Sequence, residues 1–218
     1  MDLPFTIEQF LGVFRDYNHA IWPTQVIAYL LGITAVLLVF RRGRRTTRIN
    51  SLILSAMWFW MGLVYHIAFF SEINTAAYLF GAFFIVQGVL FLVAAFGRLD
   101  LEFRFTTDAY GIAGAILITY ALVVYPIIGA ALGHGYPDAP MFGVAPCPTT
   151  IFTFGLLLWT TRGVSKWLFL IPGLWSVVGF MAAVNLGIRE DIGLLVAAVV
   201  IIALVLWRSR AKDVSLAS

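Results

Sequence analysis

The sequence predicts an all-α fold, a polytopic membrane bundle of seven transmembrane helices with the N-terminus outside and the C-terminus inside the cell. Two observations support the fold class. Hydrophobic residues make up 61% of the 218 residues and charged residues only 11%, whereas a soluble domain carries about 25% charged residues. The apolar residues also fall in separate blocks, most of which are long enough to cross a hydrocarbon core about 30 Å thick. We therefore expect one transmembrane domain over residues 1–218.

The N-terminal segment, residues 4–16, predicts a short amphipathic helix, because Phe10, Leu11 and Phe14 recur at helical spacing. This helix is expected to lie at the membrane interface or, more simply, to pack across its own bundle. Seven apolar spans follow, of which the fifth is short unless its helix begins inside the membrane. The expected spans are residues 19–40, 49–71, 75–97, 108–133, 149–161, 167–187 and 192–207.

The basic residues predict the orientation of these spans. With the N-terminus outside, the inner side holds all of the 14 Lys and Arg residues except Arg15 and Arg189. Cytoplasmic loops of membrane proteins are enriched in Lys and Arg, so this asymmetry predicts an N-out, C-in topology. The net charge of +3 therefore reflects topology and does not indicate nucleic acid as a partner.

The hairpin over residues 49–97 contains two polar side chains, His66 and Gln87, inside its apolar spans. Such side chains are costly in lipid and usually face protein or a water-filled cavity. His66 is expected about 9 Å below the outer edge of its span and uncharged, since Glu72 is six residues away and too far round the helix to pair with it. Hydrogen bonding between helices is the simpler interpretation of both residues, and a ligand site is the alternative.

Polar residues of other spans are expected to share an outward-facing cavity with His66, since a polar-lined cavity needs such side chains at comparable depth on several helices. Thr149 and Thr150 follow Pro148 at an expected helix start, where free N–H groups can hold an anion; ordinary N-capping explains them equally well. The predicted substrate-binding residues are His66, Tyr65, Tyr78, Gln87, Tyr125 (beside Pro126), Thr149, Thr150 and Asn185.

Sequence motifs for catalysis are lacking. The chain contains no HExxH, CxxC, GxSxG or GxxxxGK[ST] motif, and its single cysteine, Cys147, excludes an internal disulfide. The three histidines and Cys147 fall in the outer half of the expected topology, but none has the spacing of a helical metal site. We therefore expect no catalytic residue and no metal site, and the sequence specifies no cofactor.

These features favour a non-enzymatic membrane protein that binds or transports a small molecule through an outward-facing polar cavity. A second hypothesis is a structural or accessory subunit of a larger membrane protein complex, because 16% of the residues are aromatic and almost nothing lies outside the membrane. A third is a membrane-embedded metal or redox protein. The expected partners are thus the lipid bilayer, a small-molecule ligand and other membrane proteins.

An internal similarity aligns Trp58 with Trp175 and Gly62 with Gly179. It would relate the first three spans to the last three, which looks like the plan of the small sugar carriers of the SWEET and PQ-loop type. The Pro-Gln dipeptide of that family is absent here. Chance matches between apolar helices explain the similarity more simply.

Two motifs carry a closer resemblance. Residues 58–74 (WFWMGLVYHIAFFSEIN) and residues 146–153 (PCPTTIFT) are its most specific parts. Over nearly the whole chain the sequence resembles an uncharacterised family of bacterial multi-pass inner-membrane proteins. The resemblance implies a location in the bacterial inner (cytoplasmic) membrane, and it implies no activity, mechanism or catalytic residue.

Overall fold

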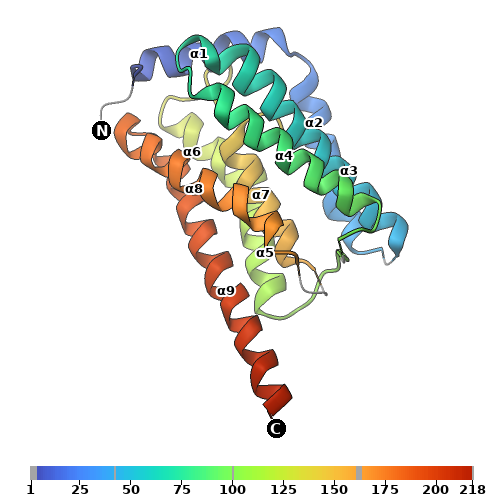
Figure 1. Ribbon diagram of the computed structural model, residues 1–218. Coiled ribbons are helices and arrows are strands. Elements are labelled where there is room, and N and C mark those ends of the chain that lie inside the picture. The colour runs from blue at the N-terminus through green and yellow to red at the C-terminus, as the bar shows by residue number, and fades with distance from the viewer. Residues whose placement is uncertain (1–3, 42, 100, 161–163, 218) are drawn as a thin grey trace.

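The computed structural model describes residues 4–41, 43–99, 101–160 and 164–217, with side chains as far as residue 204. All regular elements in these ranges are helices, which confirms the predicted all-α class. One isolated β-bridge between Phe103 and Thr160 joins two of the connecting segments. In Figure 1 the N-terminal helix runs across one end of the bundle, and the C-terminal helix extends beyond the opposite end.

Four helical segments are long and apolar enough to cross a membrane, and a bent helix pair would make a fifth. The bent pair is α1 (Ile7–Ala20) with α2 (Thr24–Val39), whose axes differ by 86°. The structure thus shows a helical chain with four to five candidate spans among its described residues, and seven spans stay a prediction. The four continuous candidates are Arg44–Glu72, Ala77–Ala95, Ala109–Ala131 and Trp167–Leu186.

Helix α1 is slightly longer than the helix expected over residues 4–16, and it begins and ends later in the chain. It begins with a capping box, in which the side chains of Thr6 and Gln9 each accept a hydrogen bond from the backbone N–H of the other residue. Its apolar face, which includes Phe10 and Phe14, is buried against the bundle. The sharp bend to α2 follows near Pro23, which is the N-cap residue of α2.

The next helix pair is a tight hairpin of α3 (Arg44–Trp60) and α4 (Ala77–Ala95). A π-helical segment, η1 (Met61–Phe69), continues α3 before a short 3₁₀ turn. The backbones approach closely where Gly62 faces Gly81, since a Cβ on Gly62 would lie 2.9 Å from the carbonyl oxygen of Gly81. This contact requires residues without side chains.

The following span has three parts, α5 (Ala109–Thr119), a π-helical segment (Tyr120–Val124) and α6 (Tyr125–Ala131). The interruption lies directly before Pro126, whose ring nitrogen cannot donate a helical hydrogen bond. The last two helices are α8 (Trp167–Leu186) and α9 (Ile192–Ala217), joined through the 3₁₀ turn η4, residues 189–191.

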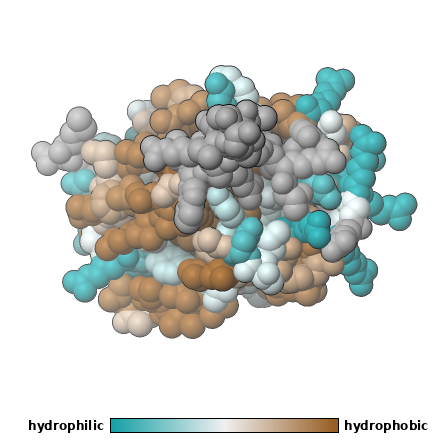
Figure 2. All heavy atoms as spheres, turned by 90° about the horizontal axis from the view of Figure 1, so that it is seen from below, coloured by the Kyte–Doolittle hydropathy of each residue, from teal (hydrophilic) through white to brown (hydrophobic). Residues whose placement is uncertain are grey.

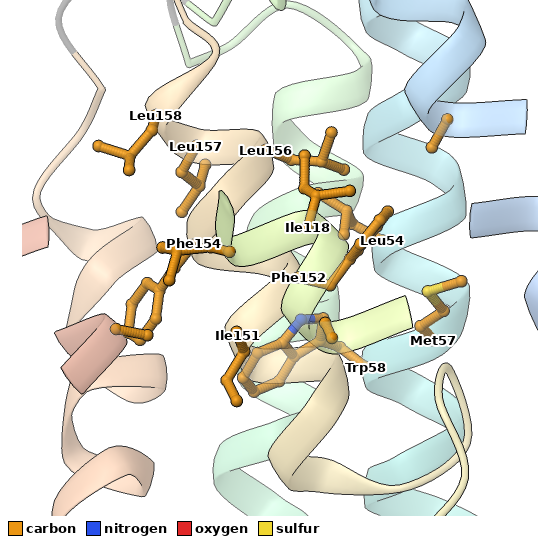
Figure 3. Packing of buried hydrophobic residues seen from close by; sticks show 14 of the residues in the cluster. Leu54, Met57, Trp58, Ile118, Ile151, Phe152, Phe154, Leu156, Leu157 and Leu158 are labelled. Atoms are coloured by element: carbon orange, nitrogen blue, oxygen red, sulfur yellow. The ribbon is translucent and has the colours of Figure 1, made fainter. Parts of the chain in front are cut away.

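Helix α7 (Pro146–Leu158) forms the centre of the bundle, and every one of its residues is buried. It packs against α5, α8 and α9. Figure 3 shows residues of α7 such as Phe152 facing Leu54 and Trp58 of α3, and Ile118 of α5. The helix begins three residues before the expected start at Thr149.

Large hydrophobic side chains cover the outside of the surrounding helices, which Figure 2 shows as brown surface. Exposed apolar side chains of this kind are typical of helices that face lipid. The residues exposed by 60% or more include Leu30, Leu37, Ile116, Ile127 and Val184.

Candidate ligand-binding cavity

A cavity of about 210 Å³ lies beneath α1, at the end of the bundle where η1 meets α4 and α8 meets η4. Most of its wall is apolar, which differs from the polar lining expected from the sequence. The side chains of Phe5, Phe10 and Phe14 form part of the wall. The polar residues of the lining are Tyr65, Asn74, Cys147, Trp175, Asn185 and Asp191.

The cavity is covered by α1, which side chains hold against the bundle. The hydroxyl of Tyr17 donates to the carbonyl oxygen of Val144 at 2.7 Å and accepts from the indole of Trp60 at 2.8 Å. At the solvent side, Arg15 donates two hydrogen bonds of 2.7 and 2.8 Å to the carboxylate of Asp138. The hydrogen bonds from Arg15 lower the pKa of Asp138 below its ordinary value. Helix α1 therefore has a fixed position as the roof of the cavity.

Asp191 is the ionisable group of most interest in the lining. Its carboxyl is 3% exposed and lies in turn η4, outside the candidate spans. Tyr125 donates a hydrogen bond to it, and the Cys147 thiol is a second contact. Burial raises the pKa of Asp191 to about 7, and the neighbouring Glu190 acts in the same direction, while the two contacts oppose them. A group with this pKa exchanges protons near neutral pH.

Glu190 lies beside it and is completely buried. One carboxylate oxygen is 3.3 Å from Nδ1 of His134, and the other has no hydrogen-bond partner among the described residues. The backbone carbonyl of Glu190 accepts from Tyr120 at 2.7 Å. Two adjacent buried acids thus occupy one turn. In the sequence, these two acids stand between two apolar blocks, and this position was the signal that could have found them. The predicted site residues did not include either acid.

His66 is completely buried, and neither ring nitrogen has a hydrogen-bond partner among the described residues. The expected hydrogen bond to a neighbouring helix is therefore not formed. The imidazole is surrounded by aromatic rings, of which the nearest are Phe84, at 4.6 Å between ring centres, Tyr65, at 5.0 Å, and Trp175, at 5.1 Å. The indole N–H of Trp175 has no hydrogen bond of normal geometry among the described residues, and its polar neighbour is the Cys147 thiol. Buried donors and acceptors without partners are rare and cost stability, so this cluster needs an explanation.

The other predicted site residues do not gather around His66. Gln87 is buried and donates to the carbonyl oxygen of Leu168 at 3.2 Å, so it links α4 to α8. Tyr78 is 57% exposed on the outside of α4 and is not part of the cavity wall. Tyr65 and Asn185 do line the cavity, and Tyr125 contacts it through Asp191.

Thr149 and Thr150 lie inside the first turns of α7 because the helix begins at Pro146. The hydroxyl of Thr149 donates to the carbonyl oxygen of Ala145 and accepts from the N–H of Gly143. Thr150 is fully buried, and its hydroxyl has no partner among the described residues. Neither residue lines the cavity, and both are buried within α7, so the structure does not bring them to an exposed helix start.

Within the part of the chain that the structure describes, no three His, Cys, Asp or Glu side chains lie close enough together to hold a metal ion. Cys147 is a buried free thiol. The site therefore consists of an apolar chamber, one buried carboxyl group in its wall and an aromatic cluster around His66 behind it.

No curated protein and no solved structure matches this chain. A family model, described as a family of unknown function (DUF6064), matches residues 7–216. The match includes α1, turn η4 and the described cavity lining apart from Phe5, and it confirms the expected resemblance to an uncharacterised family. The chain therefore belongs to the family of unknown function DUF6064.

Proposed function

We propose that this protein is a non-enzymatic membrane protein that binds or transports a small amphipathic molecule through the cavity beneath α1. The observation that carries this proposal is the carboxyl group of Asp191, which is 3% exposed in the wall of a mostly apolar cavity. A buried carboxyl group destabilises a fold unless it has partners, and it is therefore a frequent mark of a binding site. A carboxyl group in an apolar wall matches a ligand that has an apolar body and, at one end, either a hydrogen-bond donor or an amine.

The size of the cavity limits this ligand. Pockets for drug-sized molecules measure roughly 300–1,000 Å³, and this one measures about 210 Å³. The ligand is accordingly small, or only one end of a longer molecule enters. Apolar walls supply most of the affinity through burial, and Asp191 supplies the orientation.

A second hollow of about 270 Å³ lies between α4 and α8 and suggests how the ligand enters. Its lining is apolar apart from the indole of Trp175, and it shares Phe80 and Trp175 with the cavity. Movement of these two rings would connect the hollows and bring a ligand to the indole of Trp175 and to the ring nitrogens of His66, which have no partner among the described residues. This arrangement supports entry from the side of the bundle that faces lipid.

The proposed setting is the bacterial inner membrane, with seven spans and an N-out, C-in topology. The spans would be α2, α3 with η1, α4, α5 with α6, α7, α8 and α9. Helix α7 is about 20 Å long at 1.5 Å per residue, which is too short to cross alone. Its complete burial by other helices supports its place in the bundle, because a helix enclosed by protein need not match the thickness of the lipid.

Binding of a test amine to the purified protein would examine the function. We expect n-octylamine to raise the melting temperature of the wild type in detergent more than n-octanol does, because only the protonated amine can form an ion pair with Asp191, whereas the alcohol can donate only a neutral hydrogen bond. Asp191→Asn should remove the difference. Glu72→Gln, at an exposed acid near the same end of the hairpin, serves as the control and should keep it.

A second variant tests the cavity without touching the carboxyl group. Ala182 lines the cavity, so Ala182→Leu should fill part of it and abolish stabilisation by the amine. If Asp191→Asn and Ala182→Leu both respond to the amine as the wild type does, the proposed binding site is wrong.

A further inference from the structure

The opposite end of the α3–α4 hairpin contains a separate hollow of about 380 Å³. It lies between the start of α3, the end of α4 and the segment that follows α4. One side is basic and the other is apolar. Its lining residues are Arg44, Thr47, Arg48, Ala94, Ala95, Gly97, Leu99, Leu101 and Glu102.

Two guanidinium groups meet at this hollow. Arg44 and Arg48 are one helical turn apart on α3, and both reach the end of α4. Nη2 of Arg44 lies against Gly97, where an added Cβ would be only 3.0 Å from it. The guanidinium carbon of Arg48 is 4.9 Å from the ring centre of Phe96. The two residues that follow α4, Phe96 and Gly97, thus each contact one of the two arginines that line the hollow.

The described residues near this point do not neutralise both charges. The first turn of α3 contains no acidic residue. The ion pairs shown within the described part of the chain include Arg15 with Asp138 and His134 with Glu190, and these two pairs leave Arg44 and Arg48 out. The C-terminal end of α4 supplies about half a negative charge. Glu102, which has contacts of its own, also lines the hollow, so the described lining residues carry a net charge of +1.

We propose that this hollow binds the phosphate group of an anionic phospholipid headgroup. Guanidinium groups match phosphate oxygens in charge and in geometry. In the topology proposed above, this end of the hairpin lies at the cytoplasmic leaflet, where anionic headgroups collect around basic residues. The apolar wall at Ala94 and Ala95 continues to the exposed ring of Phe96, which gives the acyl chains a surface to follow. The inference rests on the proposed membrane topology and is independent of the cavity at Asp191.

Lipid titration of the purified protein in a neutral detergent tests this proposal. Phosphatidylglycerol should raise the melting temperature, and phosphatidylcholine, whose headgroup has no net charge, should not. Arg44→Gln and Arg48→Gln should each weaken the apparent affinity for phosphatidylglycerol about fivefold, which corresponds to about 1 kcal/mol for one basic residue near a headgroup. Glu102→Gln should strengthen it, because the net charge of the lining rises.

Arg45→Gln is the matched control, since Arg45 lies on the same turn of α3, is exposed and does not line the hollow. It should bind phosphatidylglycerol as the wild type does, and the affinity of each variant is measured from the rise above its own lipid-free melting temperature. An equal loss in Arg45→Gln would overturn the proposal in favour of diffuse surface charge. Equal stabilisation by phosphatidylcholine would also overturn it. If millimolar inorganic phosphate protects as well, through the same two arginines, the lipid is not the source of the phosphate.

Discussion

The hydroxyl group of Tyr125 donates a hydrogen bond to Oδ1 of Asp191, and both side chains are buried. The bond joins α6 to turn η4, which lies 66 residues further along the chain. It places the carboxyl group in the wall of the cavity and satisfies one of its oxygens. A polar contact of this kind, formed away from water, fixes the relative position of two helices.

Loss of this bond should destabilise the fold. Tyr125→Phe leaves the size of the ring unchanged and removes the donor, so the buried carboxyl group loses a partner. We expect a decrease in the free energy of unfolding of about 1–3 kcal/mol, measured by denaturant titration in detergent. Tyr78→Phe makes the same chemical change at an exposed tyrosine and should have no effect. Equal stability of Tyr125→Phe and the wild type would contradict the assigned bond.

The pKa of Asp191 predicts a dependence of stability on pH. In the folded protein burial raises this pKa from 3.8 to about 7. As the pH rises between these values, the unfolded chain releases the proton while the folded protein retains it, so the free energy of unfolding falls. Above about pH 7 this group causes no further change.

Asp191→Asn should lack this contribution. The measurement is the difference in melting temperature between wild type and variant from pH 4 to pH 8. We expect the wild type to lose stability relative to Asp191→Asn as the pH approaches 7. A difference that is constant with pH, or that changes in the opposite direction, would show that the carboxyl group is not buried in this way.

The contact between Gly62 and Gly81 predicts a steric effect. Gly62→Ala would place a Cβ 2.9 Å from a backbone oxygen, which cannot move without shifting α4. We expect a loss of about 1–3 kcal/mol, in the range usual for overpacked cores. Gly173→Ala is the control, because nothing lies within 4 Å of the new methyl group there. That variant should be neutral or more stable, since alanine favours helix.

A substitution of His66 is expected to leave the stability of the fold unchanged or to raise it. Its ring nitrogens have no partner among the described residues, so His66→Leu removes a polar group that gains nothing from the fold. The variant should be as stable as the wild type or more stable. Ser55→Ala, which removes a bond of 2.8 Å to the carbonyl oxygen of Gly88, should be less stable. A large loss in His66→Leu would instead reveal a partner for the imidazole.

Much of the fold was predictable because it depends on local composition. The apolar blocks and their polar interruptions correspond to helices that lipid or protein must surround, and the hairpin turn near Asn74 follows from them. The two specific motifs also led to the correct kind of family. The helix boundaries were less predictable. Helix α7, for example, begins at Pro146 and not at the expected Thr149.

The candidate site depended on tertiary structure. Facing residues were inferred from a period of 3.6, but η1 (Met61–Phe69) is π-helical, so it turns the side chains that follow it away from that pattern. Tyr65, inside η1, reaches the cavity, while Tyr78, on α4 beyond the turn, faces outward. The roles of Asp191 and Tyr125 depend on a contact between distant segments, which no local pattern encodes. The sequence by itself determined which segments are helices and that they are apolar, and only packing decided which of their polar groups share a cavity, because burial and pairing depend on the neighbours that folding brings together.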